Sequence, residues 1–193
     1  MSRNFWAIAD LHFSHDSCWK TFKLPSGQPL RPFSSSDEMN ETLVDNWNRL
    51  VKPNDKCYIL GDISMNKSGL QYVKRLAGHK RIILGNHDDK HSSIYHEIGF
   101  DKILSCKVFS GKFIMTHIPI HESCVDRFTI NIHGHLHANY INSPKYLGVS
   151  CEQTNYSPLN FDEIDARILS NKIRFNETGR VCNYGGGIES GNS

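Results

Sequence analysis

The sequence lacks long apolar runs and closely spaced cysteine pairs, and it has little net charge. No segment approaches the roughly 20 consecutive apolar residues that a membrane span needs, and the opening MSRNFWAIAD is too poor in apolar residues for a signal peptide. The six cysteines are scattered without a CxxC pair, which argues against a zinc knuckle and a disulfide framework. We therefore expect a cytoplasmic protein that does not enter a membrane.

Charge and length limit the partners and the number of domains. A formal net charge of +2 does not indicate binding to long nucleic acid, but it is compatible with a small phosphorylated or nucleotide substrate. At 193 residues, with 38% hydrophobic and 22% charged residues, the chain suits one globular domain. We expect this domain over residues 1–178 and a flexible, glycine- and serine-rich tail over 179–193.

Apolar periodicity predicts alternating strands and helices in the first half of the chain. Short apolar runs of strand length lie at 5–9, 56–60 and 81–84. Between the first two, residues 35–51 place apolar side chains on one helical stripe, after Ser35 and Glu38 at capping-box spacing. A second helix is expected at 68–77, ending at Gly78. This βαβαβ rhythm indicates a parallel or mostly parallel sheet.

The second half of the chain is richer in predicted strands than the first. The expected strands lie at 112–116, 128–132 and 145–150. One helix is expected at 161–170, with Asn160 as its cap. The whole pattern is that of a single α/β domain.

Five of the apolar runs end in carboxylate, amide or imidazole residues. The endings are Asp10-Leu11-His12, Gly61-Asp62, Gly85-Asn86-His87-Asp88, His117 and His133-Gly134-His135-Leu136-His137. Each one alone is an ordinary solvated turn, but the carboxyl ends of strands are where open α/β sheets place their ligand sites. Half-burying this much polarity without partners costs several kcal/mol, which metal coordination removes. Together, the endings predict a metal and substrate site.

The ordered series D-x-H, G-D, G-N-H-D, H and G-H-x-H resembles the calcineurin-like metallophosphoesterase superfamily over about residues 5–150. The segments DLHFSH, EMNETLVDNWN and NYSPLNFDEI are similar to its small stand-alone members from phages and bacteria. The resemblance implies a four-layer αββα sandwich, in which two mixed β-sheets are flanked by helices. It also implies a dinuclear metal centre at the carboxyl ends of the strands.

By this resemblance, seven side chains would bind two divalent metal ions. One ion would be held by Asp10, His12 and His137, the other by Asn86, His117 and His135, and both by Asp62. Oxygen and imidazole ligands without thiolate suit Mn²⁺, Fe, Co²⁺, Ni²⁺ or Zn²⁺, of which we expect Mn²⁺. The same resemblance implies hydrolysis of a phosphate ester by a metal-bridging hydroxide.

The resemblance also implies catalytic roles beside the metal ligands. His87 would reach the substrate and protonate the leaving oxygen, and Asp88 would orient the His87 imidazole. Weaker candidates for substrate contact are His15 and Arg31. His133 is either a support for a neighbouring ligand or a core histidine.

The expected substrate is a phosphodiester, including nucleotides, in preference to a phosphomonoester. After Asp62 the chain reads Ile63-Ser64-Met65-Asn66 and lacks the Asp-Arg pair typical of the Ser/Thr protein phosphatase branch, and Asp88 stands where that branch usually has Glu. The alternatives are a phosphatase for monoesters or phosphoproteins, a nuclease of the same superfamily, and a catalytically silent scaffold. The complete ligand series argues against the scaffold, and the GNHD motif argues against an amide hydrolase.

Overall fold

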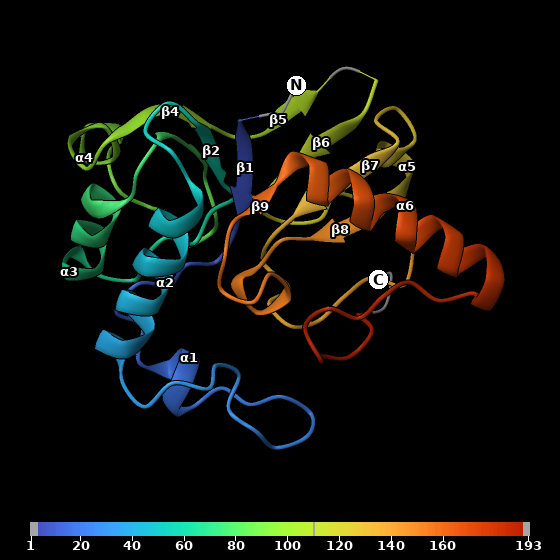
Figure 1. The fold of residues 1–193 in the computed structure, drawn as a ribbon, viewed down its shortest axis with the longest axis horizontal. Helices are drawn as coiled ribbons and strands as arrows, with labels where there is room; N and C mark the ends of the chain where they lie inside the picture. The colour runs from blue at the N-terminus through green and yellow to red at the C-terminus, as the bar shows by residue number, and fades with distance from the viewer. Residues whose placement is uncertain (1–3, 110, 191–193) are drawn as a thin grey trace.

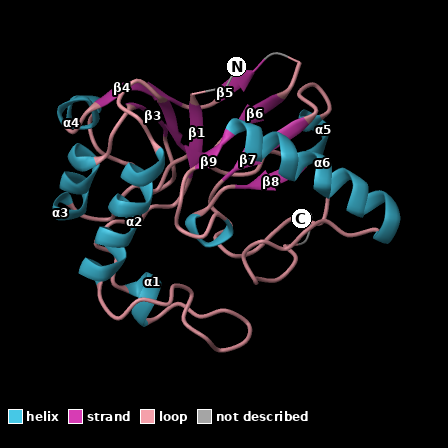
Figure 2. Cartoon of the chain, in the orientation of Figure 1, coloured by secondary structure: helices cyan, strands magenta, loops and turns pink. Residues whose placement is uncertain are grey.

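The computed structural model describes residues 4–109 and 111–190, which form two β-sheets flanked by helices (Figure 1, Figure 2). The larger sheet has the strand order β4-β3-β2-β1-β9 and the smaller one has β5-β6-β7-β8. Strands β1 to β4 are parallel to one another and β9 is antiparallel to β1. In the smaller sheet β5 is antiparallel to β6, whereas β6, β7 and β8 are parallel. Both sheets are therefore mixed, as expected.

The elements have the following bounds. The larger sheet consists of β1 (Phe5–Ile8), β2 (Lys56–Ile59), β3 (His79–Ile83), β4 (Phe100–Leu104) and β9 (Leu159–Asn160). The smaller sheet consists of β5 (Lys107–Phe109), β6 (Phe113–Met115), β7 (Ile130–His133) and β8 (Tyr146–Gly148). The helices are α1 (Ser17–Lys20), α2 (Ser36–Leu50), α3 (Lys67–Leu70), α4 (Ser92–Glu97), α5 (Glu122–Val125) and α6 (Phe161–Thr178), with 3-10 turns at Gln71–Arg75 and Cys151–Gln153.

The side-chain alternation of the central strands divides the core in two. Ile8 of β1 and Ile59 of β2 pack with Trp47 of α2 on one face of the larger sheet. Their neighbours Ala7 and Tyr58 point to the other face and pack against the smaller sheet and the start of α6. In Figure 1, α2, α3 and α4 lie on one side of the molecule and α6 on the other. The four-layer αββα sandwich is therefore confirmed.

Helix α2 begins where the sequence predicted its cap. The Ser35 side chain accepts a hydrogen bond from the backbone N–H of Glu38. The Glu38 carboxylate accepts from the backbone and hydroxyl of Ser34 rather than from Ser35, so the reciprocal half of the capping box is missing. Leu43 and Trp47, on the predicted apolar stripe, are buried in the core.

The other predicted elements differ from the structure mainly in length and regularity. The helix expected at 68–77 is the short α3 followed by a 3-10 turn. Helix α6 is capped by Asn160, as expected, but it continues to Thr178, where Gly179 ends it at a φ of 68°. Strands β4, β5 and β9 were not predicted, because β5 and β9 are short and β4 is interrupted by Asp101 and Lys102.

The segment that follows α6 lies against residues 138–142. The backbone N–H of Tyr140 donates to the Ile188 carbonyl, and the N–H of Ser190 donates to the Tyr140 carbonyl. These hydrogen bonds fix where the segment lies. The flexibility of the tail and the domain boundary at residue 178 stay predictions. Residues 191–193 of that tail lie outside the described residues. Within the described ranges, no helix is long and apolar enough to cross a membrane.

Candidate metal centre

The polar residues that follow β1, β2, β3, β6 and β7 meet at one edge of the sandwich. Two clusters of side chains each have ligand atoms within 4.8 Å of one another. These clusters are Asp10, His12 and His137, and Asp62, His117 and His135. Because the carboxyl ends of the parallel strands lie at this edge, residues up to 125 positions apart in the sequence come into contact here.

The Asp62 carboxylate lies between the two clusters. Its Oδ2 atom is 3.6 Å from Nε2 of His12 and 3.5 Å from Nε2 of His117. Asn86 joins the second cluster, with its Oδ1 atom 2.9 Å from Nε2 of His117. The structure therefore brings together all seven side chains that the sequence predicted to bind metal.

The backbone is in the left-handed region at most of these positions. The φ angles are 57° at Asp10, 48° at His12, 54° at Asp62, 68° at His135 and 53° at His137. Such a conformation costs a residue other than glycine about 1–3 kcal/mol. It persists here because neighbouring strands hold the turns, for example through the hydrogen bond from the His12 N–H to the Asp62 carbonyl. Backbone strain of this kind is concentrated at functional sites.

Glycines allow the turns to approach one another closely. A Cβ atom at Gly85 would lie 2.3 Å from Oδ1 of Asp62, and one at Gly134 would lie 2.8 Å from Oδ2 of Asp10. Neither position has room for a side chain, so both glycines are required by the positions of the two carboxylates.

One buried imidazole nitrogen has no protein partner. Nε2 of His12 is buried and makes no hydrogen bond among the described residues, although it faces the Asp62 carboxylate. Burial lowers the pKa of His12 well below its usual value, so its imidazole is neutral. An unsatisfied buried polar atom costs about 1–3 kcal/mol, and a metal ion would satisfy it. The residues present therefore fit a bound metal ion.

The imidazoles of His117 and His137 are oriented by hydrogen bonds on the side away from the site. Nδ1 of His117 lies 2.7 Å from the Leu60 carbonyl oxygen, which only accepts, so Nδ1 carries the hydrogen and Nε2 is turned toward Asp62. Nδ1 of His137 lies 3.1 Å from a carboxylate oxygen of Glu152. Backing of this type fixes the ring orientation of metal-binding histidines.

The carboxylates at the centre differ in their environments. Burial raises the pKa of Asp10 to about 6. Burial would also raise the pKa of Asp62, but the hydrogen bond and charge of His117 outweigh it and lower that pKa to about 2. Burial alone would lower the pKa of His117, but the hydrogen bond and charge of Asp62 outweigh this effect and raise that pKa to about 9. In the absence of an ion, Asp62 and His117 thus stabilise each other's charged forms, and a metal ion would compete with the proton on His117.

His87 lies at the mouth of the centre, with 41% of its side chain exposed. Its Nε2 atom is 3.9 Å from Oδ2 of Asp62, and its backbone N–H donates to Oδ1 of the same carboxylate. The imidazole is therefore beside both clusters and accessible to a substrate.

Asp88 occupies a different place from the one predicted. Its carboxylate accepts hydrogen bonds from the backbone N–H groups of Asp62, Ile63 and Gly85, at 2.7, 3.2 and 2.9 Å. It therefore holds two strand ends together, and no contact with the His87 imidazole is described. The expected role of Asp88 in orienting His87 is corrected to one of supporting the backbone.

Arg31 is also placed differently from the expectation. Its guanidinium is fully buried and donates to the carbonyl oxygens of Asp10 and Leu11 and to the Glu152 carboxylate. The sequence predicted that Arg31 contacts the substrate, whereas in the structure Arg31 anchors the 13–35 loop to the turn that bears Asp10. The charge of Arg31 keeps the pKa of Glu152 below its usual value, although burial alone would raise it.

Sequence reasoning missed Glu152, which contacts both Arg31 and His137. The signal was present, because Cys151 and Glu152 directly follow the predicted strand at 145–150 in the same way as the other polar endings. The partners of Glu152 could not be predicted, because His137 and Arg31 lie 15 and 121 positions away in the sequence.

The remaining histidines have distinct environments. Nδ1 of His15 lies 3.3 Å from Nδ1 of His12 and 3.5 Å from Sγ of Cys18, and the three residues form a further cluster able to hold a metal. His15 also lines a cavity beside the centre, so its contact with substrate stays a prediction. His133 is buried, its Nδ1 is 2.8 Å from the Gly134 carbonyl oxygen, and burial lowers its pKa to about 4. This is the environment of a core histidine.

Comparison with known proteins gives a relative that matches this chain along most of its length. No family model matches the chain. The uncharacterized protein MJ1445 of Methanocaldococcus jannaschii is 31% identical over 182 residues, which cover 89% of this chain and 94% of that protein. The Gene 66 protein of Mycobacterium phage L5 is 32% identical over 93 residues, 46% of this chain and 41% of that protein.

A solved structure shares the fold. The protein of unknown function AQ665 from Aquifex aeolicus superposes with a TM-score of 0.61 at 23% identity, covering 84% of this chain and 97% of that one. This likeness supports the architecture described above. With the extent and identity of its match to the archaeal protein, the chain belongs to the same family as MJ1445 of Methanocaldococcus jannaschii.

Proposed function

We propose that this protein is a dinuclear metal-dependent phosphoesterase that favours phosphodiesters, nucleotides included, over phosphomonoesters. The observation that carries the proposal is the position of the Asp62 carboxylate, 3.6 Å from His12 in one ligand cluster and 3.5 Å from His117 in the other. A carboxylate shared by two clusters of imidazole and oxygen ligands is suited to two divalent ions that act on one phosphoryl group.

The ligand assignment follows the two clusters. One ion would be held by Asp10, His12 and His137, the other by Asn86, His117 and His135, with Asp62 shared. We propose Mn²⁺ as the bound ion, with Fe, Co²⁺, Ni²⁺ or Zn²⁺ as alternatives, because oxygen and imidazole ligands without thiolate suit all of them. Bound at this edge, such ions would neutralise charge on the phosphoryl oxygens and lower the pKa of water to about 7.

His87 supplies the proton for the leaving group. Hydrolysis adds water across a P–O bond, so the hydroxyl goes to phosphorus and the leaving oxygen needs a proton. His87 is exposed enough to reach a substrate and is held beside Asp62 by its own backbone N–H. A positioned proton donor of this kind contributes about 10²–10⁴-fold to the rate. A catalytically silent scaffold would have no need of this accessible imidazole.

Metal removal and restoration test the proposed function. Metal-stripped protein is assayed with bis-p-nitrophenyl phosphate and p-nitrophenyl phosphate, with and without added Mn²⁺. We expect turnover of the diester that depends on Mn²⁺ and exceeds turnover of the monoester. Turnover of the monoester alone would support the phosphatase alternative. No turnover of either ester with Mn²⁺, Fe²⁺, Co²⁺, Ni²⁺ or Zn²⁺ would contradict the proposal and support the silent scaffold.

The buried carboxylate of Glu152 is expected to be important for stability. Glu152→Gln leaves the Arg31 guanidinium buried without its charged partner, and breaking a buried pair in this way costs about 3–5 kcal/mol. Urea unfolding of the metal-free protein measures the change. The matched control is Glu163→Gln, because Glu163 pairs with Arg167 at an exposed site, where a pair contributes about 0–1 kcal/mol. Equal unfolding midpoints for the two variants would refute the structural role of Glu152.

A further inference from the structure

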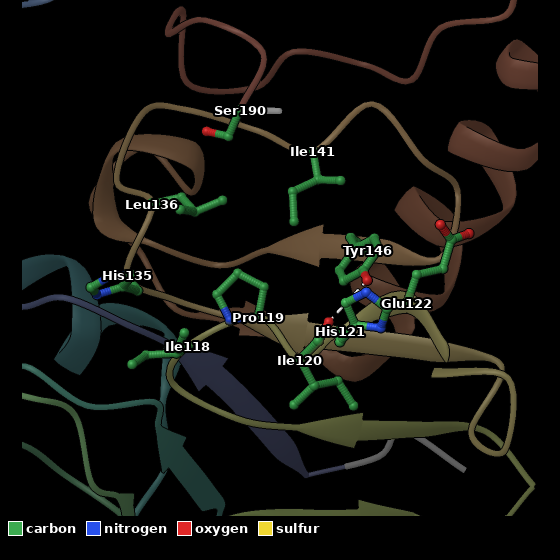
Figure 3. A pocket seen from close by; sticks show the side chains of 10 residues that line it. All are labelled: Ile118, Pro119, Ile120, His121, Glu122, His135, Leu136, Ile141, Tyr146 and Ser190. Atoms are coloured by element: carbon green, nitrogen blue, oxygen red, sulfur yellow. Dashed lines mark hydrogen bonds between the residues drawn. The ribbon is translucent and has the colours of Figure 1, made fainter. Parts of the chain in front are cut away.

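Apart from a cavity beside Asn86 and His117, two cavities that His135 lines adjoin the candidate metal centre. The first has a volume of about 570 Å³; it contains the His12, His87 and His137 side chains and has the 22–25 segment as one wall. The second has a volume of about 430 Å³ and is shown in Figure 3. The cavities share two residues, His135 and Leu136. They therefore meet at a ligand of the proposed centre.

We propose that these cavities bind the two organic groups of a phosphodiester, with the leaving group in the first cavity and the retained group in the second. This inference rests on the phosphoesterase function proposed above. It adds the part of the site that recognises each half of the substrate and a structural reason for a preference for diesters.

The position of His87 distinguishes the two cavities. His87 lines the first cavity and does not line the second. During hydrolysis the P–O bond to the leaving group breaks while a new P–O bond forms to the oxygen of water, and the leaving oxygen receives the proton. Since His87 donates that proton, the leaving group has to lie on the side of His87. The retained group then points past His135 into the second cavity.

The wall of the first cavity has exposed apolar side chains. Phe22 is 45% exposed and Met65 is 42% exposed, and both line the cavity. The Phe22 ring makes an edge-on contact with the His15 ring, with 5.8 Å between their centroids. Large apolar surfaces left in water at a site are suited to bind an apolar partner, and an aromatic ring prefers another ring. The leaving group expected here has an aromatic ring, as a nucleoside does.

The second cavity is also mainly apolar near the centre. Figure 3 shows His135 at one end and Tyr146, His121 and Glu122 at the other, with the aliphatic residues between them. Ile118 is 50% exposed, and Ile141 lies across the cavity from it. A phosphomonoester has only one organic group and would leave this space filled with water. A diester buries apolar surface in both cavities.

Two diesters with the same leaving group test the assignment. Bis-p-nitrophenyl phosphate and methyl p-nitrophenyl phosphate both release p-nitrophenolate and differ only in the group that phosphorus retains. The quantity measured is the ratio of kcat/KM for the bis ester to that for the methyl ester. Ile141→Trp fills the second cavity, and we expect it to lower this ratio by about tenfold, the usual scale for discrimination by an apolar pocket.

Two other variants complete the design. Phe22→Ala alters only the first cavity, so we expect kcat/KM to fall for both esters while their ratio stays constant. Ile173→Trp makes the same change as the test variant at an exposed position of α6 outside both cavities, and it should leave both rates unchanged.

The outcomes separate the inference from the proposed function. A ratio unchanged in Ile141→Trp, or a ratio changed by Phe22→Ala, overturns the assignment of the cavities while the diesterase activity stands. Failure of the wild-type protein to hydrolyse either diester with any of the metals overturns the function itself. Circular dichroism of Ile141→Trp, together with its rate on the methyl ester, distinguishes a filled cavity from an unfolded protein.

Discussion

Asp62→Asn is expected to lose most of its bound metal and its hydrolytic activity. The substitution keeps the size of the side chain but removes the negative charge that lies between His12 and His117. Loss of a residue that merely supports a metal ligand costs about 10–100-fold in affinity, so we expect more than about a hundredfold for the shared ligand. Metal content after dialysis against Mn²⁺, and kcat/KM on the diester, measure the two effects.

A matched control is available for this variant. Asp101→Asn makes the same change at an exposed carboxylate, which pairs with His79 at the opposite end of β3 from the centre. It should retain wild-type metal content and activity. Wild-type metal content and rate in Asp62→Asn would show that the two clusters do not form one centre.

His87→Ala is expected to lower kcat by about 10²–10⁴-fold while leaving metal content unchanged. The reason is that His87 is outside both ligand clusters, yet its imidazole lies beside the carboxylate that they share. The loss should be largest for diesters with alcohol leaving groups and smallest for p-nitrophenyl esters, because a leaving group of low pKa depends least on proton transfer from His87. A series of esters with leaving groups of increasing pKa measures this dependence.

The leaving-group series also distinguishes catalysis from structure. A merely structural role for His87 would lower the rates on all esters by the same factor. His91→Ala is the control, because His91 is exposed and its ring contacts only Ser93 among the described interactions. Loss of metal from His87→Ala would show that His87 is a metal ligand and would contradict its role as proton donor.

The residues of the candidate metal centre could be located from the sequence because the ends of apolar runs are a local signal, whereas their assignment as ligands came from the family resemblance. Asp10, Asp62 and Asn86 each follow a short apolar run, and parallel strands place such endings at one edge without any further information. Strands β1, β2, β3, β6, β7 and β8 and helix α2 were predictable for the same reason, since apolar periodicity and the Ser35 cap are features of neighbouring residues.

The supporting residues could not be read in this way because their partners are distant in the sequence. An arginine side chain is chemically suited to bind phosphate, but the position of Arg31 is set by Glu152, 121 residues away. Asp88 follows His87 directly, yet its partners are backbone groups of Asp62 and Ile63, 26 and 25 residues earlier. Polar side chains carry no periodic signal, so only the packed fold decides whether one faces a substrate or a buried carbonyl.

The left-handed backbone at the ligand positions has an evolutionary consequence. Asp, Asn and His are the residues other than glycine that tolerate such a conformation best, and they are also the residue types proposed to bind metal here. Substitution of Asp10 or His135 by a β-branched or bulky residue would therefore have two unfavourable effects: it would remove a proposed ligand and it would strain the left-handed backbone. The substitutions that the backbone itself tolerates at these positions are exchanges among Asp, Asn, His and Gly. New metal preferences in this family should accordingly arise by such exchanges, with the turns themselves unchanged.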